Sequence, residues 1–359
     1  MSAWAIVRRI VVILGASLYS AVTPSIIEST GMISFCQFGA GRIGAIHAAN
    51  IAAHPEARLC TIVETDRAAA ERLARRYGAV LRDEAEALAD PAINAVLIAS
   101  STDTHADLVE AAARAGKAIF CEKPLDLDRR RAVACAAVAE ECGVPLMVAF
   151  NRRFDPNFAR LEREIRAGRI GRPEILRITS YDPAPPTIEF VRRSGGMFRD
   201  MMIHDLDMAC WLSGEEPAEL FATASVMVDP AIGEAGDVDT AVVTLRMRSG
   251  ALCQIANTRR AVYGYDQRIE VLGSNGGVSA ENVVESTVVY SGAEGVVRDK
   301  PLPFFLQRYA EAYRGELDHF ITAVSSGAAP LVGAKEGIRA LALADAAVES
   351  ARTGRAVKL

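Results

Sequence analysis

An aspartate and a histidine four residues apart stand in a segment that otherwise has the pattern of a buried helix. The segment is GGMFRDMMIHDLDMACWL, residues 195–212, and the pair is Asp200 and His204. On a helix, residues four apart lie on one face, so the carboxylate can orient the imidazole and favour its protonated form. An oriented histidine is a suitable general base for taking a proton from an alcohol near neutral pH.

Two other interpretations of this segment stay open. Asp200, His204 and Asp207 could bind a metal, although no second cluster of histidine or cysteine supplies the remaining ligands. Alternatively, Asp200 caps a helix whose polar face only meets solvent. Asp205 receives no role. The opposite face is expected to be buried and consists of Met202, Ile203, Leu206, Ala209 and Cys210.

A glycine-rich turn between a strand and a helix is the second chemical feature. FGAGRIG places Gly39, Gly41 and Gly44 in GxGxxG spacing. The first glycine allows the tight turn, the second lets a pyrophosphate approach the backbone, and the third lets the helix pack on the strand. The helix N-terminus then faces the phosphates. We count Arg42 and Ile43, within the turn, with the cofactor-binding residues.

An acidic residue follows the next strand at the distance typical of ribose recognition. Glu64 lies twenty residues beyond Gly44. Its carboxylate can accept hydrogen bonds from the adenosine ribose hydroxyls and repels a 2′-phosphate, which favours NAD over NADP. Arg67 is close enough in sequence to weaken this preference, so NADP remains an alternative.

Polar residues also follow the later strands of this region, and ligands of open parallel sheets bind beyond the carboxyl ends of the strands. Ser100 and Thr102 could contact the nicotinamide ribose there, although Thr102 or Thr104 could instead cap the next helix. Glu122 and Lys123 follow another strand. The Lys123 ammonium could stabilise a developing alkoxide, or it could be a solvated lysine at a strand end.

The order of apolar patterns predicts the scaffold that carries these residues. From residue 33 to about residue 150, apolar strand runs alternate with helical runs, which predicts βαβ units and a parallel sheet buried on both faces. After a helix around 155–167, runs of strand pattern follow with few helices between them, which predicts an antiparallel sheet. Ser249-Gly250 is predicted to be a hairpin turn.

The predicted fold class is therefore α/β, with an N-terminal Rossmann dinucleotide-binding domain and a C-terminal α+β domain that has an open, mainly antiparallel sheet. The first domain covers 32–150 and the second, for substrate and oligomerisation, covers 151–359. A strongly periodic helix at 334–354 is expected to pack back against the first domain.

Residues 1–31 fit neither domain. They contain two arginines followed by an apolar run, as a secretory signal does, but the run is too short to cross a bilayer as a helix. Either the start is assigned too early and Met32 begins the chain, or the segment is a removable signal or a functional extension. We expect a cytoplasmic protein, or a periplasmic one if the signal is real.

Composition excludes several classes of function. A formal net charge of −5 over 359 residues leaves no basic footprint for nucleic acid and no polybasic patch for a membrane. The seven cysteines are scattered without a CxxC motif, which indicates reduced, buried thiols rather than a disulfide framework or a zinc site. We therefore expect no metal, no nucleic-acid partner and no membrane partner.

Taken together, the motifs resemble those of the Gfo/Idh/MocA oxidoreductases. GAGRIG, EKP and an Asp-x-x-x-His helix in a following α+β domain occur in that order from about Ile33 to the C-terminus. Within the family, SSTDTHADL, FNRRFDPNF, DPAPP and YGYDQRIEVLGS look like inositol 2-dehydrogenase motifs. The resemblance implies NAD-dependent oxidation of a cyclic polyol, myo-inositol to its 2-keto product, by a homotetramer that assembles through the open sheet.

The resemblance also implies roles for individual residues. Relatives usually carry aspartate where this chain has Glu64. Asp182, in the DPAPP loop, is expected to cover the substrate, and two further residues are expected to contact it, Arg153 of NRRFD and Tyr263 of YGYD. The implied catalytic residues are Lys123, Asp200 and His204.

Two alternatives to this function remain. One is a dehydrogenase of another inositol isomer or of an aldose sugar, with NAD or NADP. The other is a non-catalytic regulator that senses a dinucleotide. Such a sensor could keep Gly39 to Gly44 and lose Lys123 or His204, and both are present in this chain.

Overall fold

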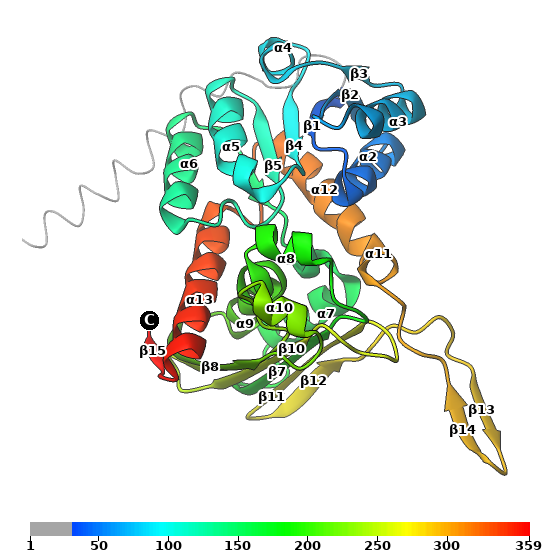
Figure 1. Cartoon of the computed structure of the whole chain (residues 1–359), viewed down its shortest axis with the longest axis vertical. Helices are drawn as coiled ribbons and strands as arrows, with labels where there is room; N and C mark the ends of the chain where they lie inside the picture. Colours follow the sequence, from blue (N-terminus) through cyan, green and yellow to red (C-terminus); the bar gives the residue numbers. More distant parts are fainter. Residues whose placement is uncertain (1–30) are drawn as a thin grey trace, which may run out of the picture.

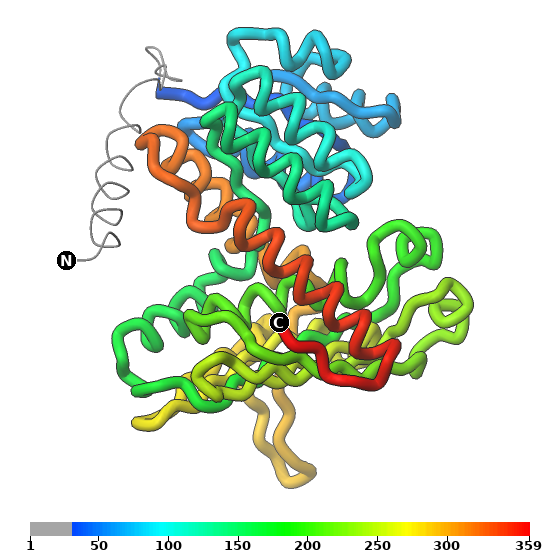
Figure 2. Tube along the Cα trace, turned by 90° about the vertical axis from the view of Figure 1, so that its left-hand side faces the viewer, coloured from blue at the N-terminus to red at the C-terminus, as the bar shows by residue number. Residues whose placement is uncertain are grey.

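The computed structural model of the chain describes residues 31–359 as two bodies stacked along the long axis of the molecule (Figures 1 and 2). The predictions for residues 1–30 lie outside the described residues. Between residues 31 and 359 no helix is long and apolar enough to cross a membrane.

The first body is a parallel six-stranded sheet in the order β3-β2-β1-β4-β5-β6, which confirms the predicted Rossmann arrangement. The central strands are buried on both faces because helices cover them. The strands are β1 (Ile33–Phe38), β2 (Ala57–Val63), β3 (Val80–Leu81), β4 (Ala95–Ile98), β5 (Ala118–Cys121) and β6 (Leu146–Val148). The helices are α2 (Arg42–Ala53), α3 (Arg67–Tyr77), α4 (Glu84–Ala89), α5 (His105–Arg114) and α6 (Arg129–Glu141).

A helix from the C-terminal region completes the core of this first body. Helix α12 (Ala310–Ser326) packs on α2, and Figure 2 shows it in orange beside the first body. Its Phe320 ring lies 6.0 Å from Phe35 and 5.4 Å from Phe120. The assignment of 151–359 to the second domain alone therefore misses a helix that returns to the first.

The second body is a seven-stranded sheet in the order β12-β11-β7-β10-β9-β8-β15. It is mainly antiparallel, as predicted, but β7 and β10 run parallel. Ser249 and Gly250 form the turn between β9 and β10, with Gly250 at a φ of 94°. The strands are β7 (Pro173–Tyr181), β8 (Pro217–Ser225), β9 (Thr240–Met247), β10 (Leu252–Thr258), β11 (Asp266–Gly273), β12 (Gly276–Ala280) and β15 (Val357–Lys358).

One further run of strand pattern in the second domain, VESTVVYS at residues 284–291, does not join this sheet. Its last part forms β13 (Val289–Gly292), which pairs only with β14 (Gly295–Arg298). Both strands are exposed along their length and project away from the body as a two-stranded ribbon (Figure 1). The short helix α11 (Phe305–Arg308) then leads into α12.

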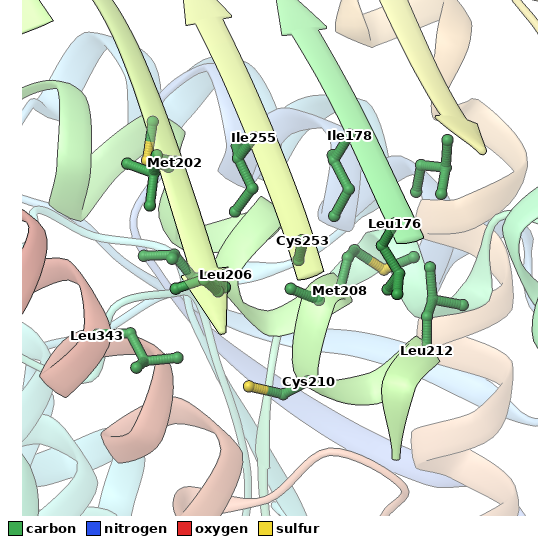
Figure 3. Close-up of a cluster of buried hydrophobic side chains, with 14 of the residues drawn as sticks. Leu176, Ile178, Met202, Leu206, Met208, Cys210, Leu212, Cys253, Ile255 and Leu343 are labelled. Atoms are coloured by element: carbon green, nitrogen blue, oxygen red, sulfur yellow. The ribbon is translucent and has the colours of Figure 1, made fainter. Parts of the chain in front are cut away.

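Helices cover the side of the second sheet that faces the first body (Figure 1). Helix α9 presents an apolar side to the strands, and Figure 3 shows Met202, Leu206 and Met208 against Ile178 and Ile255. The helices of this layer are α7 (Pro156–Arg166), α8 (Ile188–Ser194), α9 (Ile203–Ser213), α10 (Pro230–Glu234) and α13 (Ala334–Thr353).

Helix α13 joins the two bodies, as the predicted C-terminal helix was expected to do. It contacts α6 and β6 of the first body and α9 and β8 of the second. At Gly337 a Cβ would lie 3.3 Å from Val148, so the helix passes close to β6. Near its other end, Ser350 Oγ accepts a hydrogen bond from the backbone N–H of Ala222.

Candidate active site

A cleft of about 2000 Å³ lies between the two bodies at the carboxyl ends of the parallel strands, where open α/β sheets bind ligands. It is large enough for a dinucleotide and a small second ligand. Of the residues predicted from sequence, Gly44, Arg153 and Tyr263 do not line it. Those that do are Gly39, Gly41, Arg42, Ile43, Glu64, Ser100, Thr102, Glu122, Lys123, Asp182, Asp200 and His204.

The glycine-rich turn fits a pyrophosphate at one end of this cleft. Gly39 has a φ of 98°, and a Cβ there would lie 2.4 Å from the carbonyl oxygen of Ala99. A Cβ on Gly44 would lie 2.3 Å from the carbonyl oxygen of Gly39, so the third glycine lets α2 pack on the turn. A Cβ on Gly41 would meet open space in the cleft, and no side chain caps the N-terminus of α2.

Glu64 is held beside this turn by backbone hydrogen bonds. Its Oε2 accepts from the Ala40 N–H at 2.6 Å and its Oε1 from the Asp66 N–H at 2.9 Å. Burial alone would raise the pKa of Glu64, but these hydrogen bonds outweigh burial and lower it. The anionic carboxylate disfavours a 2′-phosphate nearby. Arg67 does not line the cleft, and its Nε donates a hydrogen bond to Glu71 at 2.9 Å.

The hydroxyls beyond β4 are partly occupied with one another. Ser100 Oγ and Thr104 Oγ1 are 2.7 Å apart, and Thr104 Oγ1 also donates to the Ser101 carbonyl. Thr104 does not cap α5 with its side chain. Buried His105, the first residue of α5, lies with its ring nitrogens 2.8 and 3.2 Å from the carbonyl oxygens of Pro124 and Ser100, so it ties together two strand ends of the cleft.

Lys123 crosses the cleft to the second body. Its Nζ donates to the backbone carbonyl of Asp200 at 2.8 Å and to Asp200 Oδ1 at 3.1 Å. The expectation that Asp200 orients His204 is therefore wrong, because the carboxylate holds the ammonium and makes no hydrogen bond to the imidazole. Both side chains are mostly buried, at 14% and 19% exposure.

A π-helical turn explains this difference from a regular helix. Residues Met197–Met201 form the turn η3, in which the Met202 N–H donates to the carbonyl of Met197 five residues back. Helix α9 begins only at Ile203, so Asp200 and His204 are not on one regular helical face. Gly195 and Gly196 before the turn have φ values of 86° and 76°. The turn is held by Asp237, because both of its carboxylate oxygens accept from the Met197 N–H.

His204 lies in the cleft as a neutral imidazole. Its ring packs edge-on against Phe150, with centroids 5.9 Å apart. Burial lowers the pKa of His204 well below its usual value, and the positive charges of Lys123 and Arg152 lower it further. Nδ1 is buried without a hydrogen-bond partner, which leaves Nε2 as the nitrogen that can meet a substrate.

Arg259 is a cleft residue that the sequence interpretation missed. It directly follows β10, and its side chain is 2% exposed. Its guanidinium lies 3.8 Å from Asp200 and 4.0 Å from Asp182, while Nε and Nη2 are buried without a hydrogen-bond partner. Burial raises the pKa of Asp182 to about 7, although the charge of Arg259 opposes the shift. The position at a strand end was the only available signal for Arg259.

The structure places Arg152 in the cleft rather than the neighbouring Arg153. Arg153, expected to contact substrate, binds Asp207 with Nε at 2.7 Å and Nη2 at 2.5 Å, and its guanidinium lies over the ring of Trp211. Arg152 lines the cleft instead. The η2 turn at Asn151–Phe154 sends the two consecutive side chains in different directions.

Similarly, the cleft is lined by Tyr265 and not by Tyr263. Its side chain is 42% exposed, and its hydroxyl donates to Asp266 at 2.6 Å outside the cleft. Buried Tyr265 lines the cleft. Gly264 between them has a φ of 134°, which breaks the regular alternation that would place both rings on one side.

The remaining acidic residues of α9 are structural. Asp205, which received no role from sequence, is fully buried and binds Arg152, Ser180 Oγ and Asn257 Nδ2. Asp207 is bound by Arg153 and cannot join Asp200 and His204 around a metal. Within residues 31–359, the three acidic and imidazole side chains whose ligand atoms lie within 4.8 Å of one another are different ones, namely His47, Glu122 and Glu316.

The cleft thus combines a neutral imidazole, an ammonium held by a carboxylate, and a glycine-rich turn for a dinucleotide. A neutral imidazole can accept a proton, and an ammonium beside it can stabilise an alkoxide. This is an arrangement for removing a hydride and a proton from an alcohol.

Comparisons with known proteins agree with the fold and with this chemistry. Residues 33–150 match the model of an oxidoreductase family with an NAD-binding Rossmann fold, and residues 158–279 match the GFO/IDH/MocA C-terminal domain. An inositol 2-dehydrogenase of Rhizobium meliloti is 49% identical over 91% of this chain and 99% of its own length.

Solved structures of relatives have the same fold. A myo-inositol dehydrogenase of Corynebacterium glutamicum is 41% identical with a TM-score of 0.87, over 91% of this chain and 99% of that one. A scyllo-inositol dehydrogenase of Lactobacillus casei, solved with NAD(H) and scyllo-inositol, is 28% identical with a TM-score of 0.85 over the same shares of the two chains.

Proposed function

The chain belongs to the Gfo/Idh/MocA family of NAD-binding oxidoreductases, and we propose that it oxidises myo-inositol at one carbon to the 2-keto product. The observation that carries this proposal is the group formed by Lys123, Asp200 and His204 at one end of a cleft whose other end fits a dinucleotide. The 49% identity to an inositol 2-dehydrogenase over nearly the whole chain supports the substrate class.

The proposed oxidation removes a hydride and a proton from the alcohol, and different groups accept them. When bound, NAD supplies the nicotinamide C4 that accepts the hydride. His204 Nε2 takes the proton of the reacting hydroxyl, and the product is the ketone together with a protonated imidazole. General-base assistance of this kind contributes about 10²–10⁴-fold to the rate.

Lys123 acts on the oxygen of the reacting hydroxyl. Its ammonium keeps two hydrogen bonds to Asp200, which fix its position in the cleft. A positive charge already oriented in a largely dry site stabilises negative charge that develops on this oxygen without further reorganisation. In this proposal Asp200 is a positioning residue for Lys123 rather than for His204.

Polar side chains near this group suit a ring that carries many hydroxyls. Arg259 has donors without a partner, and Asp182 can donate or accept a hydrogen bond depending on its protonation. Arg152 also lines this part of the cleft. We propose Arg152, Asp182, Arg259 and Tyr265 as the residues that bind the other hydroxyls.

A test of the proposal measures NAD reduction by the purified protein with a panel of inositol isomers and aldose sugars. The expected result is the highest kcat/KM with myo-inositol, and loss of turnover in His204→Ala while calorimetry shows that NAD still binds. Near wild-type turnover in His204→Ala contradicts the mechanism. Equal or higher kcat/KM with scyllo-inositol, the ligand of the Lactobacillus casei structure, identifies that isomer as the substrate instead.

We also propose that the protein self-associates through the outer face of its second sheet, as a tetramer, and works in the cytoplasm. The outer face carries exposed apolar side chains on neighbouring strands, including Ile175, Leu252 and Leu272. All seven cysteines are free, although Cys142 is exposed rather than buried as expected. Free thiols are typical of reducing compartments.

A further inference from the structure

Behind the cleft, three titratable side chains from distant parts of the chain meet inside the first body. Glu122 follows β5, His47 lies on α2, and Glu316 lies on α12. His47 Nε2 is 2.8 Å from Glu122 Oε1, and one nitrogen or oxygen of each residue lies within 4.8 Å of the others. Only Glu122 reaches the cleft, and the proposed reaction uses neither His47 nor Glu316.

Glu316 has no hydrogen-bond donor for either of its oxygens. The residue is fully buried, and both Oε1 and Oε2 lack a partner. The titratable groups that face it are His47 of α2, Glu122 beyond β5, and Tyr313 of its own helix. Phe154 of η2 packs against the same helix at Gly315, where an added Cβ would lie 3.4 Å from the Phe154 carbonyl oxygen. Burial, and then the charge of Glu122, raise the pKa of Glu316 well above its usual value.

The side chain of His47 makes its hydrogen bond to Glu122 and none to Glu316. The ring is buried between Phe120 and Tyr313, at centroid distances of 5.3 and 5.7 Å. Its Nδ1 has no partner, so a protonated imidazole would bury an N–H without an acceptor. The neutral tautomer with the proton on Nε2 satisfies its hydrogen bond to Glu122 and leaves Nδ1 as an acceptor only.

We propose that Glu316 is a proton-binding site: it is a neutral acid in the native enzyme and donates a hydrogen bond to the Glu122 carboxylate. The cluster then contains one proton between two carboxylates and has a single negative charge. Glu122 receives donors from His47 and Glu316 on the buried side, and its Oε2 accepts from the backbone N–H of Lys123 at 3.3 Å. Glu316 is thereby a positioning residue for a carboxylate in the cofactor cleft.

Because Glu122 lies in the cofactor cleft, the hydrogen bond from Glu316 also affects cofactor binding. Glu122 and Lys123 are consecutive residues at the end of β5, so a fixed Glu122 also fixes the backbone that carries Lys123. If Glu316 were ionised, its carboxylate would repel that of Glu122. If the side chain at position 316 had no donor, the Glu122 carboxylate would lack the hydrogen bond that holds it on the buried side. This role rests on the proposed use of the cleft for NAD, whereas the protonation of Glu316 does not depend on any activity.

The protonation is tested by comparing the stability of Glu316→Gln with that of the wild type across pH. In the unfolded chain Glu316 loses its proton in the pH range around the usual glutamate pKa. In the native protein it keeps the proton to higher pH. Raising the pH through this window therefore destabilises the wild type, by up to about tenfold in the folding constant per pH unit. Glutamine cannot lose this proton, so the variant gains stability relative to the wild type as the pH rises from about 5 to 8.

Glu311→Gln is the matched control, because it makes the same substitution at an exposed position on the same helix. Its stability difference from the wild type is expected to stay small over this range. A difference for Glu316→Gln that stays constant or falls as the pH rises shows that Glu316 ionises in the native protein as in the unfolded chain or more easily, and it overturns the proposal. One bound divalent metal per chain in purified wild type, found by elemental analysis and lost in Glu316→Gln, also overturns it.

The positioning role is tested by NAD binding in calorimetry, which requires no substrate and no turnover. Glu316→Ala removes the donor to Glu122 and is expected to raise the Kd of NAD several-fold. Glu316→Gln keeps a donor and is expected to restore a Kd close to the wild-type value. An unchanged Kd in Glu316→Ala, or an equal loss in both variants, overturns the positioning role. If the alanine variant does not fold, the pH comparison with glutamine still decides whether Glu316 is protonated.

Discussion

At the scale of single residues, the pairing of charged side chains determines the protonation of the cleft. The Asp200 carboxylate is hydrogen-bonded to the Lys123 ammonium, so it does not stabilise the protonated form of His204. Two cations, Lys123 and Arg152, face the imidazole instead, and together with burial they keep it neutral. A neutral histidine is ready to accept a proton, and once protonated it is a strong enough acid to release that proton readily.

The first prediction concerns the pH dependence of kcat/KM. Because the pKa of His204 lies well below 6.5, the base stays competent at neutral pH, and its own protonation lowers activity only as the pH falls through that lower value. A second ionisation, from Asp182, is expected near pH 7, since the pKa of this carboxyl is about 7. In Asp182→Asn the step near pH 7 should vanish while the more acidic limb remains. A wild-type limb for His204 at or above 6.5 would contradict the assignment.

The second prediction separates Arg153 from substrate binding. Arg153→Met leaves Asp207 buried with only the longer 3.5 Å contact to Arg339. Breaking a buried pair in this way costs about 3–5 kcal/mol of unfolding free energy, and the KM for the polyol should not change. Denaturant unfolding and steady-state kinetics measure the two effects. Exposed Arg160→Met is the control, with an expected cost below about 1 kcal/mol. A large rise in KM at unchanged stability would show that Arg153 contacts the substrate and would contradict this prediction.

The sequence identified the chemistry of the site better than its exact residues. Lys123 and His204 line the cleft as predicted, because a lysine at a strand end and a histidine in a helix pattern can be located from periodicity. Arg153 and Tyr263 were expected to contact the substrate but do not line the cleft, because the direction of each side chain is set within an irregular turn. Asp200 was found, but its partner was not, because nothing in the local pattern indicates a π-helical turn.

At the scale of elements, the glycine-rich turn shows how position decides what a side chain would do. A Cβ on Gly44 would collide with the carbonyl oxygen of Gly39 inside the protein, whereas a Cβ on Gly41 would meet only the open cleft. The same substitution therefore tests packing at one glycine and ligand space at the other.

The third prediction follows from this contrast. Gly41→Ala should keep the wild-type Tm and weaken NAD binding, because its methyl group occupies the space where a pyrophosphate approaches the backbone. Gly44→Ala should lower both the Tm and the affinity for NAD, because α2 must move away from the turn. Thermal unfolding and calorimetry on both variants make the comparison. Normal NAD binding in Gly41→Ala would place the phosphates elsewhere.

The positions of helices and strands were predicted well where the hydrophobic periodicity was strong. Which strands pair and where a helix packs were predicted less well. The alternating strands and helices of the first body follow from apolar runs that must be buried on both faces. The parallel pairing of β7 with β10 and the return of α12 to the first body do not follow from local pattern. Both depend on contacts between residues far apart in the chain, such as Phe320 with Phe35.

At the scale of the whole molecule, the chain crosses between its two bodies several times. Helix α12 belongs to the core of the first body, α13 spans both, and the chain ends in the second sheet at β15 (Figures 1 and 2). These crossings place Lys123 of the first body within hydrogen-bond distance of Asp200 of the second. The site therefore exists only while the two bodies are held together.

The outer face of the second sheet supports the last prediction. Helices of the described chain cover the inner face (Figure 1), while Ile175 on β7 lies between Leu252 and Leu272 on the neighbouring strands, all three exposed. An apolar row of this kind on three adjacent strands is typical of a surface that pairs with a copy of itself. Leu252→Glu places a charge in this apolar row, next to Ile175, where a second copy would bury it without a partner. Light scattering should therefore show a lower mass for Leu252→Glu than for the wild type, while Val80→Glu, an exposed apolar position on β3 of the first body, should keep the wild-type mass. A wild type with the mass of one chain, or a Leu252→Glu variant with unchanged mass, would exclude assembly through this face.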